Sequence, residues 1–446
     1  MLSKISRVTR YAVMATVLAG SAVACEDFLA VENPGAIQEP QLNDPTYIPL
    51  MVNGVIGEFQ PTWTWVTYYN ALFTDELRNN HVYFEERDID RRYVTEFNGT
   101  YSFFYYSALQ RSVFMGDSVA SRLKNLLADS ASRDLRLARV LAYSGYNYIM
   151  LGENLCVAPV NLSAPMTPAQ LFEAAITRFL EAINVAQAAR ATAAAVTPAT
   201  AASNAAVAGA DSVINLARVG AARSYLNVNN KSEAISLATP VPSAFNFWAY
   251  YSSNSARENN QFYGRLSTGS AGSNSASVTG TPYENLNDPR VPHPTATERG
   301  MNAVNVHIPN SPSGFTTYNG TVSGADFTRD ADMRVASGLE ARYIVAEARG
   351  PTAETLTFVN ERRAVGGQAA VALTGDALMA ELREQRRRDL YLDNHRLGDL
   401  RRYQEFYNVD LWQTGLYPLT TTGETYDDRR CWPLPISELE NNPNIP

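Results

Sequence analysis

The feature that most constrains the fold is an amphipathic helix predicted over residues 166–190, MTPAQLFEAAITRFLEAINVAQAAR. Thr167 is placed to cap this helix, Pro168 fits its first position, and Gln170 completes a capping box. Apolar residues then recur on one face of the helix: Leu171, Phe172, Ala175, Ile176, Phe179, Leu180 and Ile183. A helix of this kind is stable only when other elements cover its apolar face.

Two further helical patterns precede this segment. Residues 100–127 and 132–160 each place apolar side chains at helical spacing. In the second pattern the stripe consists mostly of small residues: Ala138, Ala142, Gly145 and Ile149. Because small residues allow close approach, we expect another helix to pack directly against this stripe.

Helices and turns also follow the segment. Residues 186–210, an Ala/Thr tract broken by Pro198, predict a frayed helix end and a loop. Residues 211–241 predict two short helices around a polar turn, in an order that resembles a tetratricopeptide hairpin. A similar ending occurs at residues 333–350, followed by a further helical stretch at 353–367.

These patterns predict a mostly α fold built on tetratricopeptide-like helix pairs, roughly within residues 100–241 and 333–403. Such pairs cannot bury their apolar faces alone and must stack. Residues 252–326 interrupt them with a composition rich in Ser, Asn, Gly, Thr and Pro. This stretch is too long for a plain connector, so we interpret it as a large irregular loop insertion with a short hairpin. Aromatic residues in and beside it suggest a surface role.

Residues 1–24 are predicted to be a lipoprotein signal peptide. A basic opening precedes an apolar run at residues 11–24, which is too short to span a bilayer. Ala22 and Ala24 would fit a signal peptidase, and the thiol of Cys25 would then carry the lipid. The alternative is an ordinary cleaved secretory signal with an incidental cysteine.

Composition limits the remaining possibilities. No second long apolar run appears, which indicates a soluble body of residues 25–446 on a lipid tether. The 45 acidic residues against 37 basic ones argue against a nucleic-acid partner, because phosphate binding calls for a strongly basic face. Cys156 and Cys431 could pair in an exported protein, but two buried free thiols are the preferred interpretation.

No constellation for catalysis is evident, so the chain is not expected to be an enzyme or to hold a cofactor or metal. Glu85 and Glu86 lie in a charged run that is more simply a solvated face. Motifs for nucleotide binding and for serine hydrolases are missing from the sequence. Zinc-ligand spacing is missing from the four histidines: His81, His293, His307 and His395.

Four stretches together resemble one family. CEDFLAVENPG (25–35), LNDPR (286–290), QRRRDLYLDNHRLGDLRRY (385–403) and WPLPISELENNPNI (432–445) are similar in kind, order and spacing to segments of the SusD/RagB outer-membrane nutrient-binding lipoproteins. The likeness covers essentially the whole mature chain.

The resemblance is strongest in the arginine-rich stretch, where three residues depart from the family pattern. Leu397 and Gly398 stand where the family usually has Trp and Phe, and Gln385 stands where it usually has an acid. These departures suggest a divergent branch.

The arginines of this stretch could form a polyanion site or a structural network. Aspartates interleave with them, and Asp389 and Asp399 follow Arg386 and Arg396 at helical pairing distance. We therefore expect a structural role, in which ion pairs tie the last helices together.

The resemblance implies a helical SusD-like fold at the extracellular side of the outer membrane, as a lid over a SusC-like TonB-dependent barrel. Glu26 and Asp27 resemble the export tag of such lipoproteins. The ligand would be an oligosaccharide or another small nutrient. Two alternatives are a tetratricopeptide-like adaptor lipoprotein without a nutrient ligand and a surface hydrolase.

Aromatic rings are the expected ligand contacts, because they pack against the apolar faces of sugars while polar side chains supply hydrogen bonds. The candidates are Trp63, Trp65, Tyr68, Trp248, Tyr250 and Tyr251. Trp63 and Trp65 lie two positions apart, so at least one of them is expected to face outward if the segment is extended.

Overall fold

The computed structural model describes residues 37–266, 275–299, 305–310, 315–317, 320–321, 327–418 and 423–445. The predicted signal peptide and Cys25 lie outside these residues. Residues 37–47 belong to a separate unit and form two short 3-10 helices, η1 (Glu39–Asn43) and η2 (Pro45–Tyr47). Residues 48–446 form the second compact unit, to which all of the following refers.

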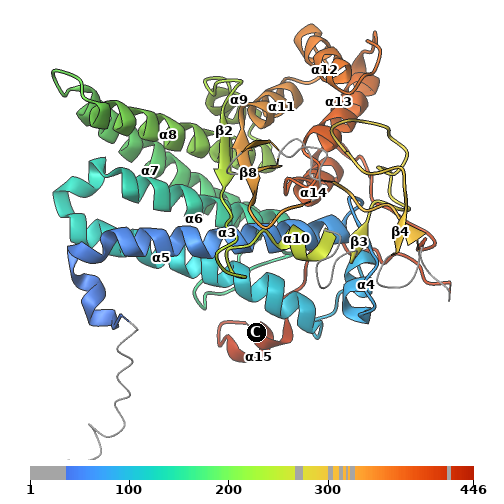
Figure 1. Ribbon diagram of the computed structural model, residues 1–446, viewed down its shortest axis with the longest axis horizontal. Coiled ribbons are helices and arrows are strands. Elements are labelled where there is room, and N and C mark those ends of the chain that lie inside the picture. The colour runs from blue at the N-terminus through green and yellow to red at the C-terminus, as the bar shows by residue number, and fades with distance from the viewer. Residues whose placement is uncertain are drawn as a thin grey trace, which may run out of the picture. The chain divides into compact units, whose positions relative to one another are not determined.

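Helices of the first half of this unit pack in sequence order, and Figure 1 shows α5 to α8 running side by side. The long helix α3 contacts both α5 and α6. The bounds are α3 (Ile48–Phe73), α4 (Phe84–Asp90), a π-helix η3 (Tyr101–Tyr106), α5 (Ser107–Leu127), a 3-10 helix η4 (Ala128–Arg133), α6 (Leu135–Asn154), α7 (Pro168–Ala194), α8 (Ala201–Asn227) and α9 (Lys231–Ala238).

The predicted helix start at residue 167 is confirmed in α7. The Thr167 side chain accepts a hydrogen bond from the Gln170 amide, and the Gln170 side chain accepts one from the Thr167 amide. The close approach of helices is confirmed as well. A Cβ on Gly145 of α6 or on Gly220 of α8 would lie 2.6 or 2.3 Å from ring atoms of Phe179. The two glycines therefore make room for this ring of α7.

The expectation for residues 186–210 was wrong in its extent. α7 continues to Ala194, and α8 already begins at Ala201, so only residues 195–200 form a linker. Alanine has the highest helix propensity, which favours helix on both sides of Pro198. Thr200 then starts α8 with a capping box of its own, formed with Ser203.

The C-terminal half contains α11 (Gly338–Arg349), α12 (Ala353–Val365), α13 (Gly375–Asp389), α14 (Arg396–Tyr407) and α15 (Ile436–Asn441). Apolar side chains of α11, α12 and α13 share one buried cluster: Tyr343, Ala346, Phe358, Val359, Leu378, Met379 and Leu382. Residues 333–337 are not helical as expected, because they belong to the buried strand β8 (Ala331–Ser337), whose last residue, Ser337, caps α11. Their alternation of Met, Arg, Val, Ala and Ser suits a strand better than a helix.

Small antiparallel sheets accompany the helices. One has the order β2-β8-β6-β7, a second pairs β1 with β3, and a third pairs β4 with β5. Within the predicted insertion, β4 and β5 match the expected short hairpin. The bounds are β1 (Arg78–Asn79), β2 (Asn246–Ala249), α10 (Gln261–Leu266), β3 (Ala276–Ser277), β4 (Glu298–Arg299), β5 (Asn305–Val306), β6 (Phe315–Thr317), β7 (Gly320–Thr321) and β8 (Ala331–Ser337).

Helices long and apolar enough to cross a bilayer are not found in the part of the chain that the structure describes.

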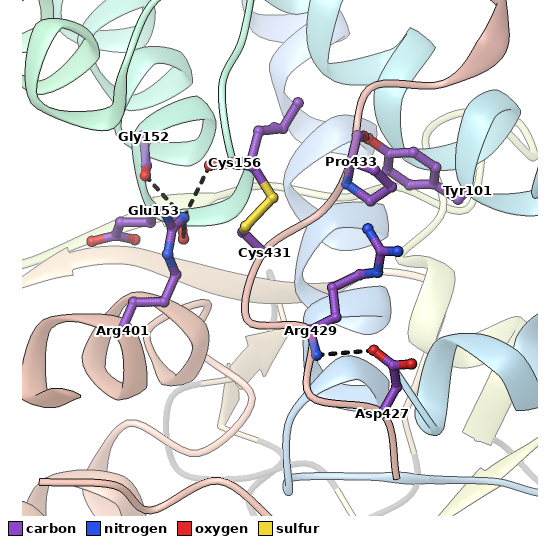
Figure 2. The surroundings of a disulfide bond; sticks show 10 residues. Tyr101, Gly152, Glu153, Cys156, Arg401, Asp427, Arg429, Cys431 and Pro433 are labelled. Carbon is purple, nitrogen blue, oxygen red and sulfur yellow. Dashed lines mark hydrogen bonds between the residues drawn. A yellow bond between two sulfur atoms is a disulfide. The ribbon is translucent and has the colours of Figure 1, made fainter. Parts of the chain in front are cut away.

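Cys156 and Cys431 form a disulfide, with their Cα atoms 5.0 Å apart, so the preferred interpretation as free thiols was wrong (Figure 2). The pairing follows from the backbone around Trp432. Its amide donates to the Asn154 carbonyl at 2.9 Å, and its carbonyl accepts from the Cys156 amide at 3.0 Å. These bonds place the C-terminal segment beside the end of α6, which sequence spacing alone did not reveal.

We expect loss of this disulfide to destabilise the protein without changing its fold. A Cys156→Ser/Cys431→Ser double variant should lose about 2–5 kcal/mol of unfolding free energy, because the unfolded chain regains the freedom that the cross-link removes. Chemical denaturation measures the change, and each single variant serves as a control that should match the double variant. Two titratable thiols at these positions in the denatured, unreduced wild type would contradict the pairing.

Candidate binding site

The six predicted aromatic residues are not equally accessible. Trp63, Tyr68 and Tyr251 are buried. Trp63 packs against the rings of Phe59 and Tyr146, at centroid distances of 5.6 and 6.2 Å. These three side chains therefore belong to the core. Trp65, Trp248 and Tyr250 keep part of their surface exposed.

Trp63 and Trp65 face different directions because α3 is a helix and not an extended segment. Residues two apart on a helix project about 200° from each other. Trp63 therefore points into the core while Trp65 remains half-buried at the surface. One of the two rings reaches the surface, but the segment is a helix and not the extended chain that the expectation assumed.

Trp65 lies at a pocket of about 310 Å³ between two helices and the insertion. α3 supplies Glu58, Pro61, Thr62 and Trp65, and α5 supplies Ala108 and Arg111. The insertion supplies Ala256, Arg257 and Gln261. Two other pockets, of about 280 and 260 Å³, are lined by none of the six aromatic candidates.

Helical spacing explains how α3 presents this pocket. Glu58, Thr62 and Trp65 lie at positions i, i+4 and i+7, which share one face of a helix. The Thr62 hydroxyl lies 2.8 Å from the Glu58 carbonyl and 3.2 Å from the Ala108 carbonyl of α5. These contacts hold the two helical walls of the pocket in a defined relation.

The charged wall of the pocket consists of two arginines on one carboxylate. Glu58 accepts a hydrogen bond from Arg111 Nε at 3.0 Å and another from Arg257 of the insertion. The Glu58 side chain is only 9% exposed, whereas Arg111 and Arg257 are 60% and 65% exposed. The carboxylate thus anchors both guanidinium groups while most of their surface meets solvent.

Other aromatic rings and the Arg265 guanidinium pack against the Trp65 indole. Its ring stacks on Tyr69 at 5.7 Å and contacts Phe104 at 4.9 Å. The Arg265 guanidinium lies 5.3 Å from the Trp65 ring and 2.9 Å from Glu86. This packing fixes the orientation of the indole at the pocket.

Glu86 corrects the interpretation of the 85–86 acidic pair as a solvated face. Its side chain is buried, and burial raises the pKa of its carboxyl despite the nearby Arg265 guanidinium. Glu85 caps the turn that leads into η3, accepting hydrogen bonds from the backbone amides of Gly99 and Thr100. Both acids therefore have structural partners.

The pocket offers binding chemistry. It combines one half-exposed indole, two guanidinium groups and the Gln261 side chain, which together can contact a ring face and the polar groups around it. Among the residues that the structure describes, no group of three or more His, Cys, Asp and Glu side chains is arranged to hold a metal ion.

The arginine-rich stretch has the expected structural role, but both predicted ion pairs were wrong. Arg396 pairs with Asp75, just after α3, at 2.6 Å, and not with Asp399. Arg386 pairs with Asp399 of the next helix at 2.7 Å, and not with Asp389. Tertiary packing places other aspartates closer to these two arginines than the aspartates three residues along the helix.

Asp399 is the centre of this network. It accepts hydrogen bonds from Arg386 and Arg402, each at 2.7 Å, and Arg402 also bonds Glu347 of α11 at 2.8 Å. Burial would raise the pKa of the Asp399 carboxyl, but the two guanidinium groups outweigh it and hold that pKa well below its usual range. The network therefore joins α11, α13 and α14 through charged groups in the core.

The LNDPR element joins the insertion to α13. Arg290 pairs with Asp288 at 2.6 Å and donates to the Gln385 side chain at 2.9 Å. Arg388 pairs with Asp288 at 3.1 Å. Gln385, one of the departures from the family pattern, thus accepts a bond from the insertion.

The closing motif completes a hydrogen-bonded hub at Asn70 of α3. The Asn70 oxygen accepts from Tyr105 at 2.8 Å and from the Trp432 indole at 3.1 Å. Its nitrogen donates to Asn394 at 2.9 Å and to Asn154 at 3.1 Å. One buried amide therefore links five distant parts of the chain.

Packing explains why position 398 is a glycine. A Cβ at this position would lie 2.5 Å from the Glu153 carboxyl carbon, and Glu153 is held by Arg223 of α8 at 2.7 Å. The Arg401 guanidinium reaches the backbone at the end of α6 beside it, donating to the Glu153 carbonyl at 2.6 Å (Figure 2). A buried ion pair thus occupies the space that a larger side chain would fill.

Comparison with known proteins identifies the fold of this chain. No family model and no curated protein matches the sequence. In structure the chain is similar to a SusD superfamily protein from Parabacteroides distasonis, with a TM-score of 0.60 and 14% identity over 90% of this chain and 98% of that one. A SusD-like carbohydrate-binding protein from Bacteroides vulgatus gives a TM-score of 0.58 and 13% identity over 85% and 88%. The chain has the SusD fold.

A laminarin-binding SusD-like protein shares the fold too, with a TM-score of 0.51 and 13% identity over 89% of this chain and 97% of that one. The predicted mostly helical, SusD-like fold is therefore confirmed. At these identities the likeness establishes the fold alone.

Replacing Gly398 with alanine should destabilise this SusD-like chain by about 1–3 kcal/mol, because the added methyl would push Glu153 away from Arg223. Thermal and chemical unfolding measure the loss. Gly54→Ala in α3 is the matched control, since nothing lies within 4 Å of its position, and should stabilise by about 0.5–1 kcal/mol. Equal stability of the Gly398 variant and wild type would contradict the packing argument.

Proposed function

We propose that this protein is a SusD/RagB-family lipoprotein that binds an oligosaccharide at the Trp65 pocket and delivers it to a SusC-like TonB-dependent transporter. It would be anchored through Cys25 at the extracellular side of the outer membrane, where Glu26 and Asp27 would serve as the export signal. The SusD fold supports this proposal, as do solved neighbours that bind carbohydrate and laminarin.

The observation that carries the binding proposal is the half-buried Trp65 beside hydrogen-bonding side chains. Its indole is oriented by Tyr69 and Phe104, so little conformational entropy is lost when a ring packs on it. Arg111, Arg257 and Gln261 surround the opening with polar donors. Trp248 and Tyr250 lie outside this pocket, and Trp63, Tyr68 and Tyr251 would act through packing.

Trp65→Ala should weaken saccharide binding about tenfold without unfolding the protein, because the ring supplies the apolar contact of the site. Affinity electrophoresis against neutral and acidic polysaccharides measures the change. Phe114→Ala is the control, because Phe114 is an exposed aromatic residue of α5 that does not line the pocket, and this variant should bind as wild type does. Unchanged affinity in a folded Trp65→Ala/Trp248→Ala double variant would remove both rings from the site.

The transport role predicts a stoichiometric partner. Native purification of the tagged protein from detergent-solubilised outer membrane should recover a TonB-dependent barrel, identified by mass spectrometry. A Cys25→Ser variant, which lacks the lipid attachment point, should be lost from the outer-membrane fraction. Recovery of the wild type with a different envelope complex would favour the adaptor alternative, and turnover of a polysaccharide by the purified chain would favour a hydrolase.

A further inference from the structure

The charges around the Trp65 pocket do not balance. Among the described residues that line it, Glu58 is the one carboxylate, and it faces two guanidinium groups, Arg111 and Arg257. Glu258 lies in the same loop but does not line the pocket, and its carboxylate accepts a hydrogen bond from the Ser255 hydroxyl. The pocket therefore carries one surplus positive charge.

Both guanidinium groups remain available to a ligand. A guanidinium has five N–H donors, and the hydrogen bonds to Glu58 use one donor of Arg111 and one of Arg257. Since both side chains are more than half exposed, their other donors face solvent. Glu58 thus positions the two arginines without consuming their capacity to bind an anion.

The surplus charge is a local feature. The chain as a whole carries a formal net charge of −8, which would repel an acidic ligand at long range. Recognition of an anion would therefore depend on the pocket itself. The other lining residues in the described part of the chain are neutral: Pro61, Thr62, Trp65, Ala108, Ala256 and Gln261.

Resting on the proposed function, we infer that the Trp65 pocket selects an oligosaccharide with a carboxylate-bearing sugar, a uronic acid unit. The sugar ring packs against the exposed part of the Trp65 indole, and the carboxylate of the sugar binds between Arg111 and Arg257. The planar guanidinium fork matches the geometry of a carboxylate, and a single surplus charge matches a monoanion. Charge-assisted hydrogen bonds of this kind are about twice as strong as neutral ones.

The test compares ligands that differ only in charge. Isothermal titration calorimetry of the purified mature chain uses oligogalacturonide and alginate oligosaccharide, each against its carboxyl-methyl ester, with laminarin oligosaccharide as a neutral glycan. The free acids should bind about tenfold more tightly than their esters, and added salt should reduce this ratio. Binding of the sulfated glycan carrageenan in place of both uronates would assign the site to sulfate and overturn the carboxylate.

Variants separate this inference from a structural role of the charges. Arg111→Gln/Arg257→Gln should lower the acid-to-ester affinity ratio to about one. Glu58→Gln should raise that ratio several-fold, because it removes the internal carboxylate that competes with the ligand. Arg190→Gln on α7, outside the pocket, should leave the ratio as in wild type. Thermal unfolding establishes that each variant is folded.

The outcomes distinguish the two proposals. Tight, Trp65-dependent binding of the neutral glycan or of the esters, with no gain for the acids, would overturn the acidic ligand and leave the proposed function standing. A fall in the ratio for Glu58→Gln would also overturn it. A folded chain that binds none of the saccharides would count against both.

Discussion

The C-terminal half of the protein depends on the ion pairs that the buried carboxylate of Asp399 makes with two arginines. This carboxylate lies between Arg386 and Arg402, on two different helices, and its low pKa keeps it charged in the core. Removing one partner of such a buried pair leaves the other charge uncompensated, which costs far more than the pair contributes. The arginine-rich stretch therefore behaves as a single unit, and the Asp288–Arg290 element attaches the insertion to that same unit.

Local patterns predicted the helices well, because helix caps and apolar spacing depend on residues close in sequence. The capping box at Thr167 and the stripe that contains Gly145 are of this kind. Ion pairing was predicted poorly for the same reason. Arg396 has an aspartate three residues away, yet it pairs with Asp75, which is 321 positions distant. The disulfide, likewise, depends on where Trp432 lies against α6 and not on spacing.

The candidate site could be predicted only in part. Composition and resemblance nominated Trp63 and Trp65 as candidate ligand contacts, but which of the two rings reaches the surface depends on how α3 is rotated about its axis. The charged wall was not predicted at all, because Glu58 and Arg257 are 199 positions apart. A glutamate and an arginine in separate patterns carry no sequence signal of their pairing. The departure at Gly398 could be noticed from sequence, while its cause, the Glu153–Arg223 pair, could not.

The hub at Asn70 has a consequence for the order in which this chain can complete its fold. Four groups satisfy one amide in the first long helix, and one of them is the indole of Trp432, contributed 362 residues later. A chain that folds from its N-terminus can form individual helices early, but the Asn70 oxygen has only its hydrogen bond from Tyr105 until the Trp432 indole arrives with the last segment. The hydrogen bonding of α3 is therefore complete only when the last segment is in place, and a chain truncated before Trp432 lacks one of the four partners of Asn70.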